Sequence, residues 1–173
     1  MYLKKFTRIY IGNEFCPLNF PDLNTLDTIL NSALKEIFDI TISFPFVREK
    51  NLNKYEKILD FLKEWCANNN KQIEIIVNDW GTLNLITCKY KEFTPVLGRL
   101  LNKIKKDPRL IGKLGIHDLR EVYIENNLNF EEFSDYLNNL GVYRYVETSL
   151  QKNKIKNKYF EGKCNNFCYY PWV

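Results

Sequence analysis

Short apolar runs recur along this chain at a spacing that is typical of strands separated by helices. The run Ile-Glu-Ile-Ile-Val at residues 73–77 is nearly continuous, which is the pattern of a parallel strand covered on both faces. The other runs are shorter and end at turn-forming residues such as glycine and proline. Together they predict five strands, at residues 6–12, 40–44, 73–77, 94–99 and 142–147.

The segments between these strands carry the apolar spacing of amphipathic helices. Residues 24–37 place their apolar positions on one helical face, with Asn24 or Thr25 available as the N-cap. A second stripe runs from residue 55 to residue 66, and its last member, Cys66, is interpreted as a packing residue. A short helix or turn is expected near residues 81–87, and another helix near residues 130–140. That last helix should stop at Gly141, where glycine supplies a left-handed C-cap.

Strands that alternate with helices in this way predict parallel βαβ units and a single α/β domain over residues 1–173. Such units wind either into an open sheet or around a barrel. A complete (β/α)₈ barrel needs roughly 250 residues. The chain is shorter than that, so we expect an incomplete TIM-like (β/α) barrel.

Composition narrows the class of protein. Apolar residues make up 45% of the chain and charged residues 27%, which is typical of a globular protein. No apolar run approaches the roughly 18 residues of a membrane span, and the N-terminus lacks the apolar core of a signal peptide. These features predict a cytoplasmic protein with no membrane association.

The formal net charge of +4 is concentrated in two segments, at residues 103–113 and 152–163. Two interpretations stay open. The lysines and arginines could face an anionic partner such as RNA, or they could be solvated loops of a chain rich in lysine and asparagine.

Polar residues follow each predicted strand. The carboxyl ends of parallel strands share one edge, where active sites of α/β proteins gather. We therefore expect a site at this edge. Its catalytic candidates are Asp79, Arg99 and Glu147, and its substrate-binding candidates are Asn13, Glu14, Arg48, Asn78 and Trp80.

Asp79 also fits a second role, because it precedes the turn at Trp80 and Gly81 and could cap a helix there. A hydrolase of the Ser/His or Cys/His type has no visible support. The only histidine, His117, lies in a polar turn without a second histidine or a nearby nucleophile.

Cysteines supply a candidate metal site. Cys16 follows the first strand, and Cys164 and Cys168 lie near the end of the sequence. Thiolates are soft ligands that select zinc, copper(I) or iron–sulfur clusters. The alternative is that all three are free thiols in loops, and Cys88, which follows an apolar run, is expected to be a buried thiol rather than a fourth ligand.

Five blocks in order resemble the strand-end motifs of the collagenase-like U32 peptidase family. The first is Ile-Tyr-Ile-Gly-Asn-Glu-Phe-Cys at residues 9–16, and the last is Tyr-Tyr-Pro-Trp at residues 169–172. The others lie at residues 75–83, 96–102 and 140–147. The blocks span nearly the whole chain, although each is short.

The resemblance implies a TIM-like barrel and, in several members, a four-cysteine iron–sulfur cluster in place of a proteolytic site. Such members support oxygen-independent hydroxylation in ubiquinone synthesis or the hydroxylation of RNA bases. Cys16, Cys164 and Cys168 match the family's cluster ligands, and a fourth ligand is missing because the family continues beyond the position of Val173. Asn78, Asp79, Arg99 and Glu147 match its strand-end polar positions.

Three hypotheses follow. The first is a cluster protein with a redox or hydroxylation role, and the second is a peptidase. The third is a shortened, non-catalytic member that acts as a subunit with a partner chain or as a homo-oligomer.

Overall fold

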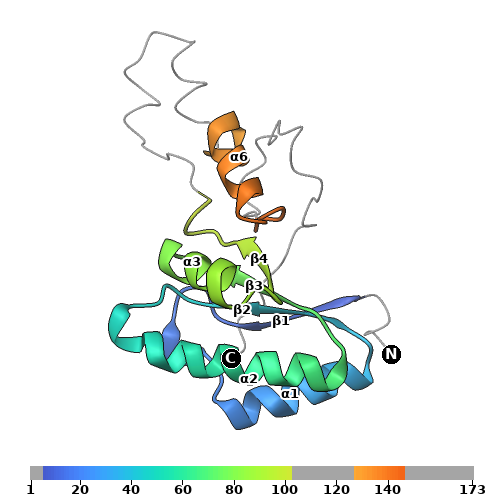
Figure 1. The fold of residues 1–173 in the computed structure, drawn as a ribbon. Helices are drawn as coiled ribbons and strands as arrows, with labels where there is room; N and C mark the ends of the chain where they lie inside the picture. The colour runs from blue at the N-terminus through green and yellow to red at the C-terminus, as the bar shows by residue number, and fades with distance from the viewer. Residues whose placement is uncertain (1–5, 103–126, 147–173) are drawn as a thin grey trace, which may run out of the picture.

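The computed structural model describes residues 6–102 and 127–146. Its centre is a parallel sheet whose four strands lie side by side in the order in which they occur along the chain (Figure 1). The α/β class and the parallel βα units predicted from the sequence are therefore confirmed. The strands are β1 (Arg8–Gly12), β2 (Asp39–Ser43), β3 (Ile73–Val77) and β4 (Thr94–Leu97).

Helices connect consecutive strands. The helix α1 begins one residue after Asp22, whose side chain accepts a hydrogen bond from the Thr25 backbone N–H at 2.8 Å. Asp22, and neither Asn24 nor Thr25, is thus the N-cap, so that prediction was wrong. The helices are η2 (Pro17–Asn19), α1 (Leu23–Lys35), η3 (Glu49–Asn51), α2 (Leu52–Asn69), α3 (Trp80–Lys89), η4 (Asn127–Asn129) and α6 (Glu131–Asn139).

The end of α1 also differs from its prediction. The helix stops at Lys35, and Ile37 has a positive φ of 60° and is 80% exposed instead of buried on the apolar face. A β-branched residue rarely adopts this conformation, which here lets the chain turn from α1 into β2. The C-terminal end of α6 matches its prediction better, because Gly141 follows the helix with φ of 75°.

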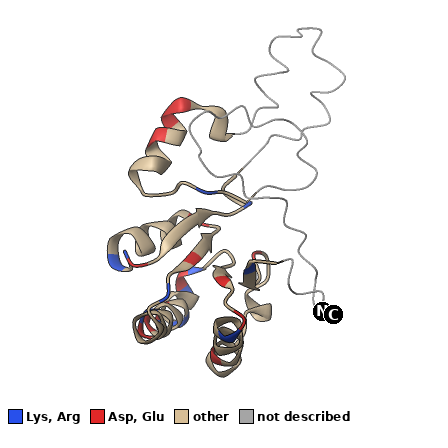
Figure 2. Ribbon diagram, turned by 90° about the vertical axis from the view of Figure 1, so that its right-hand side faces the viewer, with Lys and Arg blue, Asp and Glu red and all other residues tan. Residues whose placement is uncertain are grey.

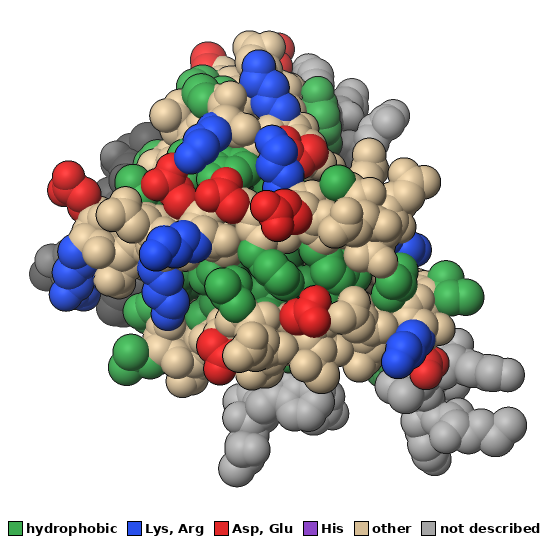
Figure 3. Space-filling view, turned by 60° about the horizontal axis from the view of Figure 1, so that its bottom comes forward, with side chains coloured by type: hydrophobic (Ala, Val, Ile, Leu, Met, Phe, Trp, Pro, Cys, Tyr) green, Lys and Arg blue, Asp and Glu red, His purple; other side chains and the backbone are tan. Residues whose placement is uncertain are grey.

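The helices pack on one face of the sheet and form the main core with it. Figure 2 shows them along one side of the strands. Ile11, Ile42 and Ile75 contribute this face of the sheet, and Leu59 of α2 and Leu83 of α3 pack in the same cluster. Burial of one such side chain stabilises the fold by roughly 1.5–3 kcal/mol. On the outer surface of the helical layer, hydrophobic side chains form a band among charged ones (Figure 3).

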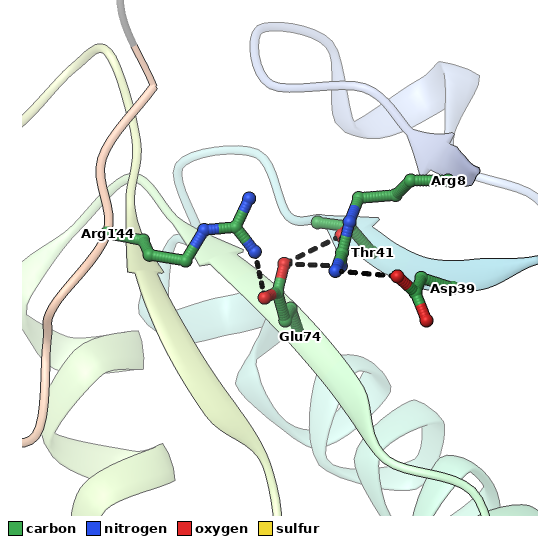
Figure 4. Close-up of polar contacts among 5 residues, drawn as sticks. All are labelled: Arg8, Asp39, Thr41, Glu74 and Arg144. Carbon is green, nitrogen blue, oxygen red and sulfur yellow. Dashed lines mark hydrogen bonds and ion pairs between the residues drawn. The ribbon is translucent and has the colours of Figure 1, made fainter. Parts of the chain in front are cut away.

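The opposite face of the sheet carries a polar layer. Glu74 on β3 accepts a hydrogen bond from Arg8 on β1 at 2.6 Å and another from Arg144, which lies beyond β4 (Figure 4). Arg8 also donates to Thr41 and Asp39. Side chains from both edges of the sheet therefore meet at Glu74 on the third strand.

An apolar cluster lies on the same face as this polar layer. Ile76, Val96 and Val146 are buried together, and Tyr10 packs against them. Because Tyr10 belongs to β1 and Val146 lies beyond β4, this cluster also joins the two edges of the sheet.

The predicted fifth strand is present only in part. Tyr145 forms a parallel bridge with Leu97, supported by hydrogen bonds from the Leu97 N–H to the Arg144 carbonyl and from the Val146 N–H to the Leu97 carbonyl. Residues 142–146 thus continue the order of the sheet without forming a described strand, and the predicted end at Glu147 lies outside the described residues. None of the described helices has the length and apolarity needed to cross a bilayer.

Candidate functional site

The exit of β1 is shaped by Gly12 and Asn13. Gly12 has a positive φ of 111°, and a Cβ atom at this position would lie 2.4 Å from the Ser43 carbonyl oxygen. Asn13 then accepts hydrogen bonds from the backbone N–H groups of Phe15 (2.9 Å) and Cys16 (2.8 Å). This turn buries Glu14 and leaves Phe15 60% exposed. Asn13, predicted to bind substrate, therefore fixes the backbone of the turn.

Glu14 and Arg99 form the central ion pair of the carboxyl edge. The Arg99 Nε donates to Glu14 Oε2 at 2.5 Å and joins the exits of β1 and β4, although 85 residues separate them in sequence. The Glu14 side chain has no exposed surface, and that of Arg99 is 23% exposed. Burial raises the pKa of Glu14, and the neighbouring charge and hydrogen bond of Arg99 oppose this rise. Within the described structure, Glu14 Oε1 is buried without a hydrogen-bond partner.

Phe15 is a site residue that the sequence analysis missed. The Arg99 guanidinium lies over its ring, 4.8 Å from the ring centre, in a cation–π contact. The sequence feature that could have identified Phe15 is its position between Glu14 and Cys16 in a polar turn. A phenylalanine in such a turn does not belong to the apolar face of a strand or helix. The exposed Phe15 ring therefore contacts the arginine of the ion pair.

Asn78 ties together the exits of three strands. Its Nδ2 donates to the Phe44 carbonyl after β2 at 2.8 Å, and its Oδ1 accepts from the Leu100 N–H after β4 at 3.2 Å. Gly98 allows this close packing, because a Cβ atom there would lie 2.1 Å from Asn78 Oδ1. These contacts give Asn78 a structural role, and its predicted role in substrate binding is untested.

Asp79 is the N-cap of α3, as one of its two interpretations predicted. Oδ1 accepts from the Thr82 N–H at 2.7 Å, and Oδ2 accepts from the Thr82 hydroxyl at 2.8 Å and the Val47 N–H at 3.0 Å. The carboxylate therefore also holds the loop after β2 against α3. The cap interpretation is confirmed, and a catalytic role of Asp79 stays a prediction.

Replacing Asp79 with alanine should lower the free energy of unfolding by about 2 kcal/mol, because the cap is lost and the Val47 N–H is left without its acceptor. Chemical denaturation measures this change. Asp22→Ala, which removes the exposed cap of α1, is the matched control and should have a smaller effect. An Asp79→Ala loss no larger than that of the control would contradict the structural role.

Trp80 and Arg48 lie at other parts of the same edge. Trp80 is 44% exposed and makes edge contacts with Phe133 and Tyr136, each with ring centres 6.0 Å apart. Arg48 is exposed and precedes η3. The structure thus joins Glu14 to Arg99, whereas Trp80 contacts α6.

Of the candidate metal ligands, only Cys16 lies in the described residues, where its partly buried side chain belongs to the residue that caps η2. Cys164 and Cys168 lie outside them, as do Glu147 and His117. No three His, Cys, Asp or Glu side chains in the described part gather closely enough to hold a metal ion.

The two remaining cysteines differ from each other. Cys66 is buried as predicted, and burial raises the pKa of its thiol to about 11, with a further contribution from Glu92. Cys88 is exposed on α3, so the prediction of a buried thiol was wrong. The apolar run before Cys88 belongs to a helix, and the helical turn places Cys88 on the outer side.

No protein-family model, curated protein or solved structure matches the chain. Family membership therefore stays a hypothesis that rests on the sequence motifs.

Proposed function

We propose that this chain is a U32-like protein that binds an iron–sulfur cluster through Cys16, Cys164 and Cys168 and supports a redox or oxygen-independent hydroxylation reaction. The observation that carries the proposal is the position of Cys16. It lies at the carboxyl edge, two residues after the buried Glu14 and partly exposed. A thiol in that place is accessible to a metal and adjacent to a polar site.

The proposal includes an incomplete TIM-like barrel. It is supported by the sequential strand order and by helices on one face of the sheet. In such barrels, side chains on the face away from the helices fill the interior in layers. Arg8 on β1, Glu74 on β3 and Arg144 beyond β4 lie together on that face, and Thr41 on β2 joins them.

Among the described residues, Cys16 has the donor atom that a soft metal group requires. A cysteine thiolate is the preferred donor for iron–sulfur clusters. When bound, the cluster supplies one-electron transfer. The chain's own residues would then bind the substrate: Arg99, whose side chain is partly exposed and held by the buried Glu14, offers a fixed guanidinium at the edge, and the exposed Phe15 ring lies against it.

The two other hypotheses keep distinct supports. The peptidase hypothesis rests on the family resemblance alone. A subunit completed by a partner chain is supported by the order of the described sheet, in which β1 is an edge strand that another chain could cover. The basic segments that would bind RNA lie outside the described residues.

Anaerobic purification with iron and sulfide analysis tests the proposal. The wild type should contain both elements and show the broad visible absorbance of a thiolate-bound cluster. Cys16→Ala, Cys164→Ala and Cys168→Ala should each lose most of the iron. Cys88→Ala, which removes an exposed cysteine on α3, should retain it.

An iron-free, colourless wild type would contradict the proposed binding of an iron–sulfur cluster. Cleavage of denatured protein without iron would then favour the peptidase hypothesis. Copurification with another chain would favour the subunit hypothesis.

A further inference from the structure

The start of α3 and one face of α6 form an aromatic patch, which consists of Trp80, Phe133 and Tyr136. The Trp80 ring makes edge contacts with the other two rings, and in both pairs the ring centres are 6.0 Å apart. Trp80 is nevertheless 44% exposed and Tyr136 is 51% exposed. Single exposed aromatic residues need no explanation, but rings that contact one another and stay about half exposed are a feature of interaction surfaces.

The other described tryptophan has a structural role. Trp65 on α2 is 5% exposed, and its Nε1 donates to Asn31 Oδ1 at 3.1 Å. The indole of Trp80 makes no hydrogen bond to any part of the chain that the structure describes. Trp80 therefore combines an exposed ring with an unused donor, whereas Trp65 is satisfied within the fold.

The helix α6 also carries three exposed acidic side chains. These are Glu131, Glu132 and Asp135, and the helix contains no lysine or arginine (Figure 2). None of the three belongs to an ion pair within residues 6–102 and 127–146. The helix dipole favours acidic residues in the first turn, which accounts for Glu131 and Glu132 but not for Asp135 in the second turn.

Glu132 is the acidic residue next to the aromatic patch. Tyr136 follows Phe133 by three residues and Glu132 by four, and residues at these spacings are neighbours on a helix surface. Tyr136 thus has an aromatic ring on one side and a carboxylate on the other. A cation attracted by that carboxylate lies beside the electron-rich rings, which is the arrangement of a cation–π site.

We propose that the aromatic patch binds a positively charged peptide segment of a partner protein, with an arginine side chain stacked on Trp80 and Tyr136 and paired with Glu132. Arginine suits the site because its planar guanidinium stacks on aromatic rings and also pairs with a carboxylate. The chain has a net charge of +4, so the attraction of a basic peptide must come from the local charge of α6. The inference does not depend on a bound cluster.

Fluorescence anisotropy of a labelled hexa-arginine peptide, titrated with the whole chain at low salt, tests the inference. Trp80→Leu and Tyr136→Leu should each weaken binding by about 2–5-fold, the usual size of an exposed cation–π contact. Glu132→Gln should also weaken binding, with a smaller effect at about 1 M salt, where the screening length falls to about 3 Å. Tyr143→Leu and Glu64→Gln are the matched controls. They replace an exposed tyrosine and an exposed glutamate elsewhere and should leave the affinity unchanged.

Each other outcome overturns the proposal. A wild type that does not bind the peptide excludes the site. Equal affinity for hexa-lysine, or Leu variants that fold by circular dichroism and bind as the wild type does, would mean charge attraction without stacking. Self-association of the wild type that Tyr136→Leu abolishes would assign the patch to a second copy of the chain. If Trp80→Leu does not fold, Tyr136→Leu and Glu132→Gln decide the question, because they change exposed side chains.

Discussion

Replacing Arg99 with methionine should lower the free energy of unfolding by about 3–5 kcal/mol near neutral pH, the usual effect of removing one partner of a buried ion pair. Methionine keeps an unbranched apolar stem over Phe15 but leaves the fully buried Glu14 without its ionic partner. Chemical denaturation across a range of pH measures the change.

The pH dependence of this loss identifies Glu14 as its source. Burial already raises the pKa of Glu14 in the folded wild type. A group that binds its proton more tightly when folded stabilises the fold at low pH, and this contribution is lost as the pH rises through the folded pKa. Without Arg99 the pKa rises further, so the deficit of Arg99→Met should shrink as the pH falls toward that value.

Two further variants control the experiment. Arg48→Met removes an exposed arginine at the same edge and should change stability by no more than about 0.5 kcal/mol. Glu14→Gln/Arg99→Met removes both charges and should recover part of the loss of Arg99→Met. A loss below about 1 kcal/mol that does not vary with pH would mean that water screens the pair, as at an exposed salt bridge.

Gly98→Ala should destabilise the fold by about 3 kcal/mol or more, since overpacking and a disrupted buried hydrogen bond act together. The added Cβ would lie 2.1 Å from Asn78 Oδ1 and 2.7 Å from the Val77 carbonyl oxygen. Either Asn78 moves and abandons its bonds to Phe44 and Leu100, or β3 and β4 separate at their exits. Thermal or chemical unfolding reports the loss.

Gly141→Ala separates crowding from backbone preference. Gly141 has φ of 75°, but an added Cβ would meet no atom within 4 Å. Only the cost of a left-handed alanine is expected there, roughly 1–2 kcal/mol. Equal losses in the two glycine variants would contradict the steric account of Gly98.

Local pattern was enough to predict the α/β class and the parallel βα units. The continuous apolar run of β3 has the bounds that its spacing predicts, because every side chain of a doubly covered strand is apolar or paired. The cap of α1 was missed because Asp22, Asn24 and Thr25 are all good caps, and the choice among them depends on how the chain leaves Pro21. Cys88 was misplaced because its apolar neighbours were treated as one block, whereas in α3 they face inward on a helical period.

The sequence predicted where the candidate site lies in the fold, but it did not predict which of its side chains contact one another. The rule that polar strand ends share one edge brings Glu14 and Arg99 to the same region. The rule cannot show that Glu14 and Arg99 form an ion pair, whereas Asn78 and Asp79 bond to the backbone. These roles depend on how deeply each side chain is buried and on which way it points, and Glu14 and Arg99 are 85 residues apart in the sequence. The packing of Phe20 against Tyr55 is likewise a tertiary contact with no local pattern.

The polar layer on Glu74 sets an order of events during synthesis. Arg8 precedes Glu74 by 66 residues and Arg144 follows it by 70. At roughly 5–20 residues per second, a ribosome needs about 4–14 s to reach Arg144 after Glu74 has been made. During that interval Arg8 is the one of these two arginines that can neutralise the Glu74 carboxylate. A chain that lost Arg8 would pass this stage with Glu74 bonded to the neutral Thr41 hydroxyl, so the arginine on the first strand supplies the countercharge before the second arginine exists.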